Sequence, residues 1–258
     1  MFVIDLDCQS TKVGQAGPSR WIGMKSEDGI VRLYPQSLVK QFQLKTNPEF
    51  SPADIIAEFN SDVDFWFEDD ATPIKPTQYG FLYMTLHEFI HGLGFVSIWD
   101  PSPYFVTVNT TELLNKFAPK GTKFDSEDDF YAKFQNSAQY KIATDMLKYA
   151  TTPLSFVNNT ANDQLFYLET SLNPYQPGSS VSHVSQALYL KSIEFLMSYQ
   201  EPQGKTLKDV IKNGGNYVGG SIGPKFLSIL ESLGYATADN PNPEIPTLLD
   251  PPFYVDNF

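Results

Sequence analysis

The sequence predicts an α+β fold in which a small, twisted, mixed sheet packs on one buried helix and is followed by a mostly helical and irregular C-terminal lobe. Three observations support this prediction. Short segments rich in β-branched and aromatic residues occur before residue 70. The segment from Phe81 to Leu93 is apolar on almost all sides, which is typical of a buried helix. After Trp99 the chain consists mainly of short helical segments and turns.

The strands of the sheet are expected near the N-terminus. Polar and glycine-rich residues between 7 and 29 predict no further element, and Pro35 to Val39 predicts a short helix or a loop. The segment 53–59 also fits a short helix, because brief apolar runs do not distinguish the two. The expected strands cover residues 2–6, 30–34, 53–59 and 63–67.

The second half of the chain predicts short helices and an extended end. The last helix is expected to begin at Pro224 and end at Gly234, since proline suits a first turn and glycine a C-terminal cap. The proline-rich segment after residue 237 shows no helical pattern. We expect an N-terminal lobe over 1–95, a C-terminal lobe over 96–237 and an extended tail over 238–258. The helical segments are 111–117, 128–134, 137–149, 184–195 and 224–233.

The composition limits the classes of partner. Of the 258 residues 41% are hydrophobic, and the formal net charge is −12. An acidic chain without a basic run is not expected to bind nucleic acid or an anionic membrane surface. No apolar run approaches the roughly 20 residues that span a bilayer. We expect a monomer.

The chain carries signals of its cellular location. Residues 1–7 are too short and too acidic for a signal peptide, so either a leader was removed or the chain is cytosolic. The sequons at Asn109 and Asn158 favour the first case, and we predict a secreted protein whose leader and any pro-segment are absent from this chain. Cys8 is the single cysteine, which predicts a free thiol, a bond to a lost segment or a metal-blocking thiol.

The strongest motif is His87-Glu88-x-x-His91 within the predicted buried helix. Residues four apart lie on one face of a helix, so both imidazoles would point at a common zinc ion. Glu88 would stand beside the metal without binding it. From there it can take a proton from a zinc-bound water and pass it to a leaving amine.

A catalytic zinc ion needs a third protein ligand and an open position for water. The sequence holds three histidines, so a histidine ligand can only be His183. Two other ligands stay open at this stage. Glu112 follows His91 at a distance near that of the glutamate ligand in thermolysin-like proteases, and Asp100 is the alternative.

The extended motif His87-Glu88-x-x-His91-x-x-Gly94 resembles the start of the metzincin protease signature, H-E-x-x-H-x-x-G-x-x-H. The third histidine of that signature would fall at 97, where this chain has Ser97. A leishmanolysin-like branch takes this histidine from far downstream, in a Ser-His dipeptide followed by Leu-Met. Ser182-His183 and Leu196-Met197 match that pattern.

Related secreted fungal and bacterial proteases share further short motifs with this chain. These motifs include Gly92-Leu93-Gly94-Phe95, the approach from Gly178 to His183, and the segment from Ile222-Gly223-Pro224 to Leu233-Gly234-Tyr235. The resemblance covers roughly residues 50–236 and implies a metzincin-like arrangement of sheet, helix and C-terminal lobe. It also implies that Met197 forms the methionine-containing turn under the metal. In astacin-like and serralysin-like proteases a tyrosine two residues beyond this methionine approaches the zinc, which makes Tyr199 a candidate to stabilise the oxyanion, but the leishmanolysin-like branch does not require it.

Residues and resemblance together predict a zinc-dependent endopeptidase, with His87, His91 and His183 as ligands and Glu88 as the general base and acid. Its substrates would be proteins or peptides, bound along the edge strand of the sheet. The alternative is a non-catalytic protein that binds peptides or a partner on the same fold. The acidic segments 68–73 and 125–129 carry carboxylates of the kind that bind calcium, but they lack EF-hand spacing and are interpreted as solvated loops.

Overall fold

The computed structural model describes residues 2–6, 12–29, 31–96, 167–169, 182–215, 217–218 and 220–256, together with positions 172, 176, 178 and 179. It confirms the α+β class. Several predictions concern residues outside these ranges. They are Cys8, Ser97, Asp100, Glu112, both sequons, the helices expected over 111–117, 128–134 and 137–149, and the acidic segment 125–129.

The first sheet is small and mixed, as predicted. It contains β1 (Phe2–Leu6), β5 (Ile55–Phe59) and β2 (Gly14–Pro18) in the order β1-β5-β2. β1 runs parallel to β5 and β2 antiparallel to it. β2 lies in the polar, glycine-rich segment that predicted no element. Its glycines and polar residues carry little strand preference, and its backbone pairing with β5 forms the strand instead.

A second sheet corrects the prediction that all early strands share one sheet. β4 (Val31–Pro35) pairs with β3 (Arg20–Lys25), which in turn pairs with β8 (Thr247–Asp256). The predicted tail is therefore extended but forms the outer strand of this sheet. Arg20 stabilises the end of β8, because the Nε and Nη2 atoms of Arg20 donate to the two carboxylate oxygens of Asp256 at 2.5 and 3.0 Å.

The predicted strand over 63–67 shortens to β6 (Phe65–Trp66), which pairs with β7 (Tyr79–Gly80). The acidic loop that follows β6 is exposed. One carboxylate oxygen of Asp70 in this loop accepts the Phe67 backbone N–H at 3.0 Å, so the loop is organised by a local turn.

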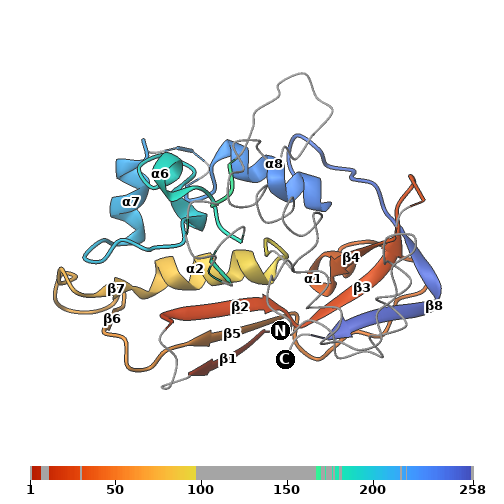
Figure 1. Ribbon diagram of the computed structural model, residues 1–258, viewed down its shortest axis with the longest axis horizontal. Coiled ribbons are helices and arrows are strands. Elements are labelled where there is room, and N and C mark those ends of the chain that lie inside the picture. The colour runs from red at the N-terminus through yellow and green to blue at the C-terminus, as the bar shows by residue number, and fades with distance from the viewer. Residues whose placement is uncertain are drawn as a thin grey trace, which may run out of the picture.

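The central helix is α2 (Phe81–Gly92), which contacts β2 and β5 on one side. Figure 1 shows it between the first sheet and the group formed by α6, α7 and α8. Close packing on the sheet depends on Gly92. A Cβ atom there would lie 2.3 Å from Cγ2 of Ile55, well inside van der Waals contact.

The described residues after α2 contain short helices. They are α6 (Gln186–Tyr189), the 3₁₀ helix η2 (Phe195–Met197), α7 (Leu207–Asn213) and α8 (Pro224–Leu233). The short helix α1 (Gln36–Val39) lies earlier in the chain, directly after β4. The start and end predicted for α8 are confirmed, with Gly234 at φ 109°. No observation from sequence predicted α7, whose first turn has a Thr206–Asp209 capping box.

The continuous helix predicted over 184–195 is wrong. Val184 bridges to Leu168 on one side and to Ser198 on the other, so its backbone is extended. The helix begins only at Gln186 and ends at Tyr189, and the chain then turns into η2. The described part of the chain contains no helix that is long and apolar enough to cross a membrane.

Candidate metal centre

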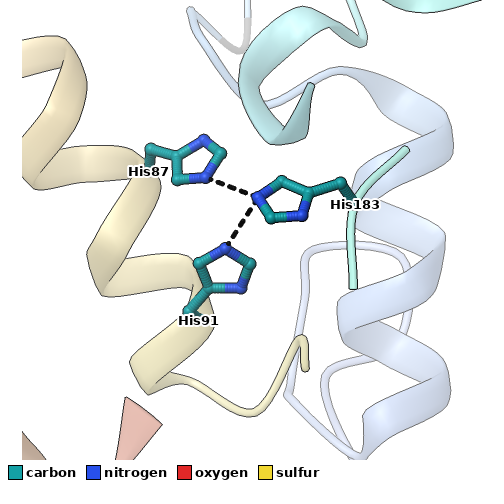
Figure 2. Close-up of side chains that lie close together, drawn as sticks. All are labelled: His87, His91 and His183. Atoms are coloured by element: carbon teal, nitrogen blue, oxygen red, sulfur yellow. Dashed lines mark hydrogen bonds between the residues drawn. The ribbon is translucent and has the colours of Figure 1, made fainter. Parts of the chain in front are cut away.

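Two of the predicted ligands are adjacent on α2. His87 and His91 are separated by one helical turn, and their ring centroids lie 4.9 Å apart. Both side chains are buried. The face of α2 that carries them points toward the segment around His183 (Figure 2).

The third predicted ligand reaches the same point from a distant part of the chain. Nε2 of His183 lies 3.1 Å from Nε2 of His87 and 3.2 Å from Nε2 of His91. Two nitrogens bound tetrahedrally to one zinc ion at about 2.0–2.1 Å lie about 3.3 Å apart. The three rings point toward one another in Figure 2, so the spacing suits a single small cation.

The second nitrogen of each ring determines its tautomer. Nδ1 of His87 lies 2.7 Å from the Leu196 carbonyl oxygen, Nδ1 of His91 2.7 Å from that of Phe95, and Nδ1 of His183 3.0 Å from that of Ser179. A carbonyl oxygen only accepts, so every Nδ1 carries the hydrogen. All three Nε2 lone pairs then face one another without a proton to share.

This arrangement has the donor chemistry of a metal site. Metal-binding histidines usually donate their other N–H to a carbonyl or carboxylate, which orients the ring. Protonation of these histidines is unfavourable, because burial lowers the pKa of His87 to about 3 and that of His91 to about 4. A proton shared among the rings is therefore a poor substitute for a metal ion. Burial also lowers the pKa of His183 well below its usual value. The described residues therefore fit a divalent metal ion.

The end of α2 holds His91 in place. Gly94 adopts φ 103°, and its N–H donates to the carbonyl oxygen of His91, while the Phe95 N–H donates to that of Ile90. This is the Schellman pattern for which glycine is favoured. The turn brings the Phe95 carbonyl back to the ring of His91. Gly94 therefore provides the left-handed turn that ends α2, whereas Gly92 lies within the helix.

The turn containing Met197 holds the other two histidines. The carbonyl oxygen of Leu196 accepts from His87, and that of Met197 accepts the Val184 N–H at 2.8 Å, next to His183. Met197 itself is fully buried. Tyr83 packs its ring on Phe195 with a centroid distance of 5.8 Å, which supports η2 from α2.

Glu194 anchors the same turn to α8. Its two carboxylate oxygens accept the backbone N–H groups of Lys225 and Phe226 at 2.8 and 2.9 Å. These donors are free at the start of any helix, and Gly223, the N-cap residue, has no side chain to accept them. Gly223 also leaves room for the carboxylate, since a Cβ there would lie 2.4 Å from Glu194 Oε2.

Glu88 is buried beside the histidines. Its Oε2 atom has no hydrogen-bond partner among the described residues, and its Oε1 faces Gly14 of β2, where a Cβ would lie 3.1 Å away. Burial raises the pKa of Glu88 to about 8, and the charge of Glu201 adds to this effect while Lys12 opposes it. A carboxyl group held in this way is suited to accept and release a proton near neutral pH.

The metal centre opens into a cleft with a volume of about 800 Å³. Its walls come from β2, from α2, from the segment before His183 and from the residues after Met197. β2 pairs with β5 along one edge, and its opposite edge is unpaired within the described sheet. Tyr199 lines the same cleft and is partly exposed.

Glu201 is a cleft residue that the sequence analysis missed. Its carboxylate Oε1 lies 3.7 Å from Nε2 of His87, and its side chain is 12% exposed. Burial raises its pKa to about 7. Nothing in its local sequence marks it, because a single glutamate before Pro202 is typical of a solvated loop. The rival ligands Asp100 and Glu112 lie outside the described residues.

The structure thus brings together His87, His91 and His183 in a buried group that could hold a metal ion, with Glu88 buried on the same helix and lining the same cleft. The chain belongs to the SPBPB7E8-like family, whose sequence profile matches residues 4–108 and 102–252. It is also similar to the uncharacterized protein PB7E8.01 of Schizosaccharomyces pombe, with 25% identity over 285 residues. That alignment covers 86% of this chain and 50% of the yeast protein, so the chain spans about half the length of this relative. No solved structure matches the chain.

Proposed function

We propose that the protein is a secreted zinc metalloendopeptidase that hydrolyses peptide bonds of proteins or peptides. The observation that carries the proposal is the convergence of three Nε2 lone pairs, each oriented by a carbonyl on the opposite ring nitrogen. Imidazole ligands suit zinc among the available divalent metals. Among the described residues the group holds three histidines and no fourth protein ligand, which is typical of catalytic zinc sites, where one position stays open.

His87, His91 and His183 would hold the metal. A bound zinc ion would supply Lewis acidity, polarising the scissile carbonyl group and lowering the pKa of a water molecule. Glu88 would accept the proton of the attacking water and donate it to the leaving amine. Its unpartnered Oε2 atom and its position between the histidines and β2 suit this role.

The unpaired edge of β2 supports an extended peptide as substrate. An added strand would pair with the backbone of Gly14 to Pro18 and pass along the cleft that contains Glu88. Gly14 brings the strand close to Glu88, because its missing side chain leaves the carboxylate room. β2 is therefore the strand that the predicted mode of substrate binding requires.

The resemblance to leishmanolysin-like metzincins agrees with this proposal. It assigns His183 as the distant third ligand and Met197 to the turn beneath the site. The backbone contacts of the Met197 turn support that assignment, because its carbonyl oxygens accept hydrogen bonds from His87 and from the residue after His183. Tyr199 on the cleft wall is the candidate for oxyanion stabilisation.

The second candidate function is a non-catalytic protein that binds peptides in the same cleft. In that case a peptide would bind in the same cleft and along the same edge of β2 without being cleaved. Glu88 favours the enzyme, because a buried carboxylate with an unpartnered oxygen costs stability and a binding protein has no use for it.

Elemental analysis and peptide digestion of three proteins test the proposal. Wild type should bind one zinc ion per chain and cleave casein, and a chelator should stop cleavage until zinc is restored. His183→Ala should lose most of its zinc. Glu88→Gln should keep its zinc but lose cleavage by at least about a hundredfold, the usual size of a general-base contribution.

Each result separates the candidates. Full zinc in His183→Ala would remove this residue from the site and favour Asp100 or Glu112. Equal cleavage by Glu88→Gln would exclude the proposed general base. Zinc binding and peptide binding without cleavage in the wild type would establish the non-catalytic alternative.

A further inference from the structure

We propose that Glu201 forms a cation-binding subsite beside the metal centre, which selects peptides with a lysine or arginine close to the scissile bond. The subsite deepens the proposed function, because it identifies the class of substrate that this cleft prefers. It is also a property of the cleft that direct binding can test without catalysis.

The position of Glu201 is the first support. Its carboxylate lies 3.7 Å from Nε2 of His87, so a group that contacts it also lies next to the ligands of the metal. The residue lines the cleft, although its side chain is 12% exposed. A peptide that passes the metal centre would therefore meet this carboxylate within one or two residues of the bond to be cut.

The lack of a cationic partner is the second support. His87 is the side chain that lies within ion-pair distance of Glu201 among the described residues, and its Nδ1–H is already donated to Leu196. Buried carboxylates are normally paired or hydrogen-bonded. The Glu201 carboxylate accepts a hydrogen bond from its own backbone N–H, and no described lysine or arginine pairs with it. A lysine or arginine of the substrate would supply a charged donor in a site with limited access to water.

The charge around the cleft is the third support. The described lining contains three carboxylates, from Glu58, Glu88 and Glu201, against a single lysine, Lys12. Lys12 donates to Gln15 at 2.9 Å, and Gln15 in turn donates to Glu58. The cation of the lining is thus engaged near Glu58 and does not pair with Glu201. The cleft is expected to repel an acidic peptide and attract a basic one.

A competing role for Glu201 is direct binding of the metal. The three histidine nitrogens lie within 4.8 Å of one another, and no oxygen of Glu201 belongs to that group. Its position beside one histidine fits a group that contacts the substrate better than a fourth ligand.

Binding of a matched set of peptides tests the proposal. Octapeptides with acetyl and amide ends and an otherwise uncharged sequence would carry one Lys, Gln or Glu, moved through every position. Their affinities would be measured by fluorescence anisotropy for the zinc-loaded full chain with Glu88→Gln, which suppresses cleavage. At one or two positions the lysine peptide should bind about tenfold tighter than the glutamine peptide, and the glutamate peptide weaker still.

Three further proteins complete the design, all with Glu88→Gln. Adding Glu201→Gln should remove the preference for lysine, and adding Glu201→Asp should restore part of it. Adding Glu58→Gln removes the same charge elsewhere on the lining, so it should weaken lysine peptides to the same small extent at every position and keep the preference at the one or two positions beside Glu201. Cobalt substituted for zinc reports on the ligands, and its absorption spectrum should be the same with and without Glu201→Gln.

The outcomes are decisive in each direction. No preference for lysine in the parent, or the same preference after Glu201→Gln, would overturn the subsite. A changed cobalt spectrum with a tenfold or greater loss of metal affinity would show that Glu201 is a ligand. A chain that prefers lysine peptides but never cleaves them would refute the protease and leave the subsite standing, whereas cleavage without charge preference would do the reverse.

Discussion

Replacing Gly94 with alanine should weaken both the fold and the metal centre, because this residue joins the end of α2 to the carbonyl that orients His91. Gly94 adopts φ 103°, a conformation that residues with a Cβ rarely adopt. Its N–H donates to the His91 carbonyl, and the following carbonyl, of Phe95, accepts from Nδ1 of the same residue. A shift of the turn therefore moves the ring.

Two effects add up in the expected loss of stability. A left-handed conformation costs an alanine about 1–2 kcal/mol relative to glycine. The new Cβ would also lie 3.0 Å from Cγ of Pro35, and overpacking of this kind costs about 1–2 kcal/mol more. We expect a total loss of about 2–4 kcal/mol in the free energy of unfolding. Zinc affinity should fall about tenfold, which is the usual loss when a group that orients a metal-binding histidine is mutated.

Gly220→Ala is the matched control. Gly220 has φ 72°, yet a Cβ at this position meets no atom of the described residues within 4 Å, the three histidines included. This variant should lose about 1–2 kcal/mol from backbone strain alone and keep its zinc affinity. Urea denaturation of the metal-free proteins measures the stability, and titration against a competing chelator measures the affinity.

The comparison can refute the reasoning in two ways. Equal zinc affinity in Gly94→Ala and wild type would show that the Phe95 carbonyl does not control His91. Equal loss of stability in both alanine variants would show that the contact with Pro35 relaxes at no cost.

Three further predictions concern the same framework. Gly92→Ala should cost about 1–3 kcal/mol, since its Cβ would overlap Ile55, and adding Ile55→Ala should recover part of that loss in a double-mutant cycle. Glu194→Ala should cost about 2–4 kcal/mol in urea denaturation, because it leaves the half-buried Lys225 N–H and the buried Phe226 N–H without their acceptors. Glu68→Ala in the exposed loop should change stability by less than about 0.5 kcal/mol. Metal-free wild type should lose stability relative to Glu88→Gln as the pH rises from 4.5 to about 8. Burial raises the pKa of Glu88, so over this range the folded chain keeps a proton that the unfolded chain releases. A difference in the free energy of unfolding that stays constant across this range would contradict the burial of Glu88.

Much of the metal centre follows from local spacing. His87 and His91 face the same way because a helix repeats every 3.6 residues, and Gly94 ends that helix because glycine tolerates positive φ. Pro224 and Gly234 mark the ends of α8 for the same kind of reason. Each of these properties depends on residues within a few positions of one another, and periodicity and backbone preference are sufficient to predict it.

Segments stabilised by distant partners were predicted less well. β2 has little strand preference of its own and forms by pairing with β5. The sequence of β8 predicts a proline-rich tail, but pairing with β3 makes it a strand. The helix expected over 184–195 is shortened because Val184 pairs with Leu168 and Ser198 instead. In each case a backbone hydrogen-bond partner far along the chain outweighs the local pattern.

The sequence by itself determined the residue types of the site: two histidines and a glutamate on one helix, and a third histidine suggested by counting and by the Ser-His and Leu-Met pattern. Tertiary structure decided which distant groups join them. It brought His183 within 3.2 Å of His91, put the Leu196 carbonyl against His87, and buried Glu201 beside the same ring. The physical reason is that helix geometry is set by neighbouring residues, whereas the approach of segments about a hundred residues apart depends on how the whole core packs.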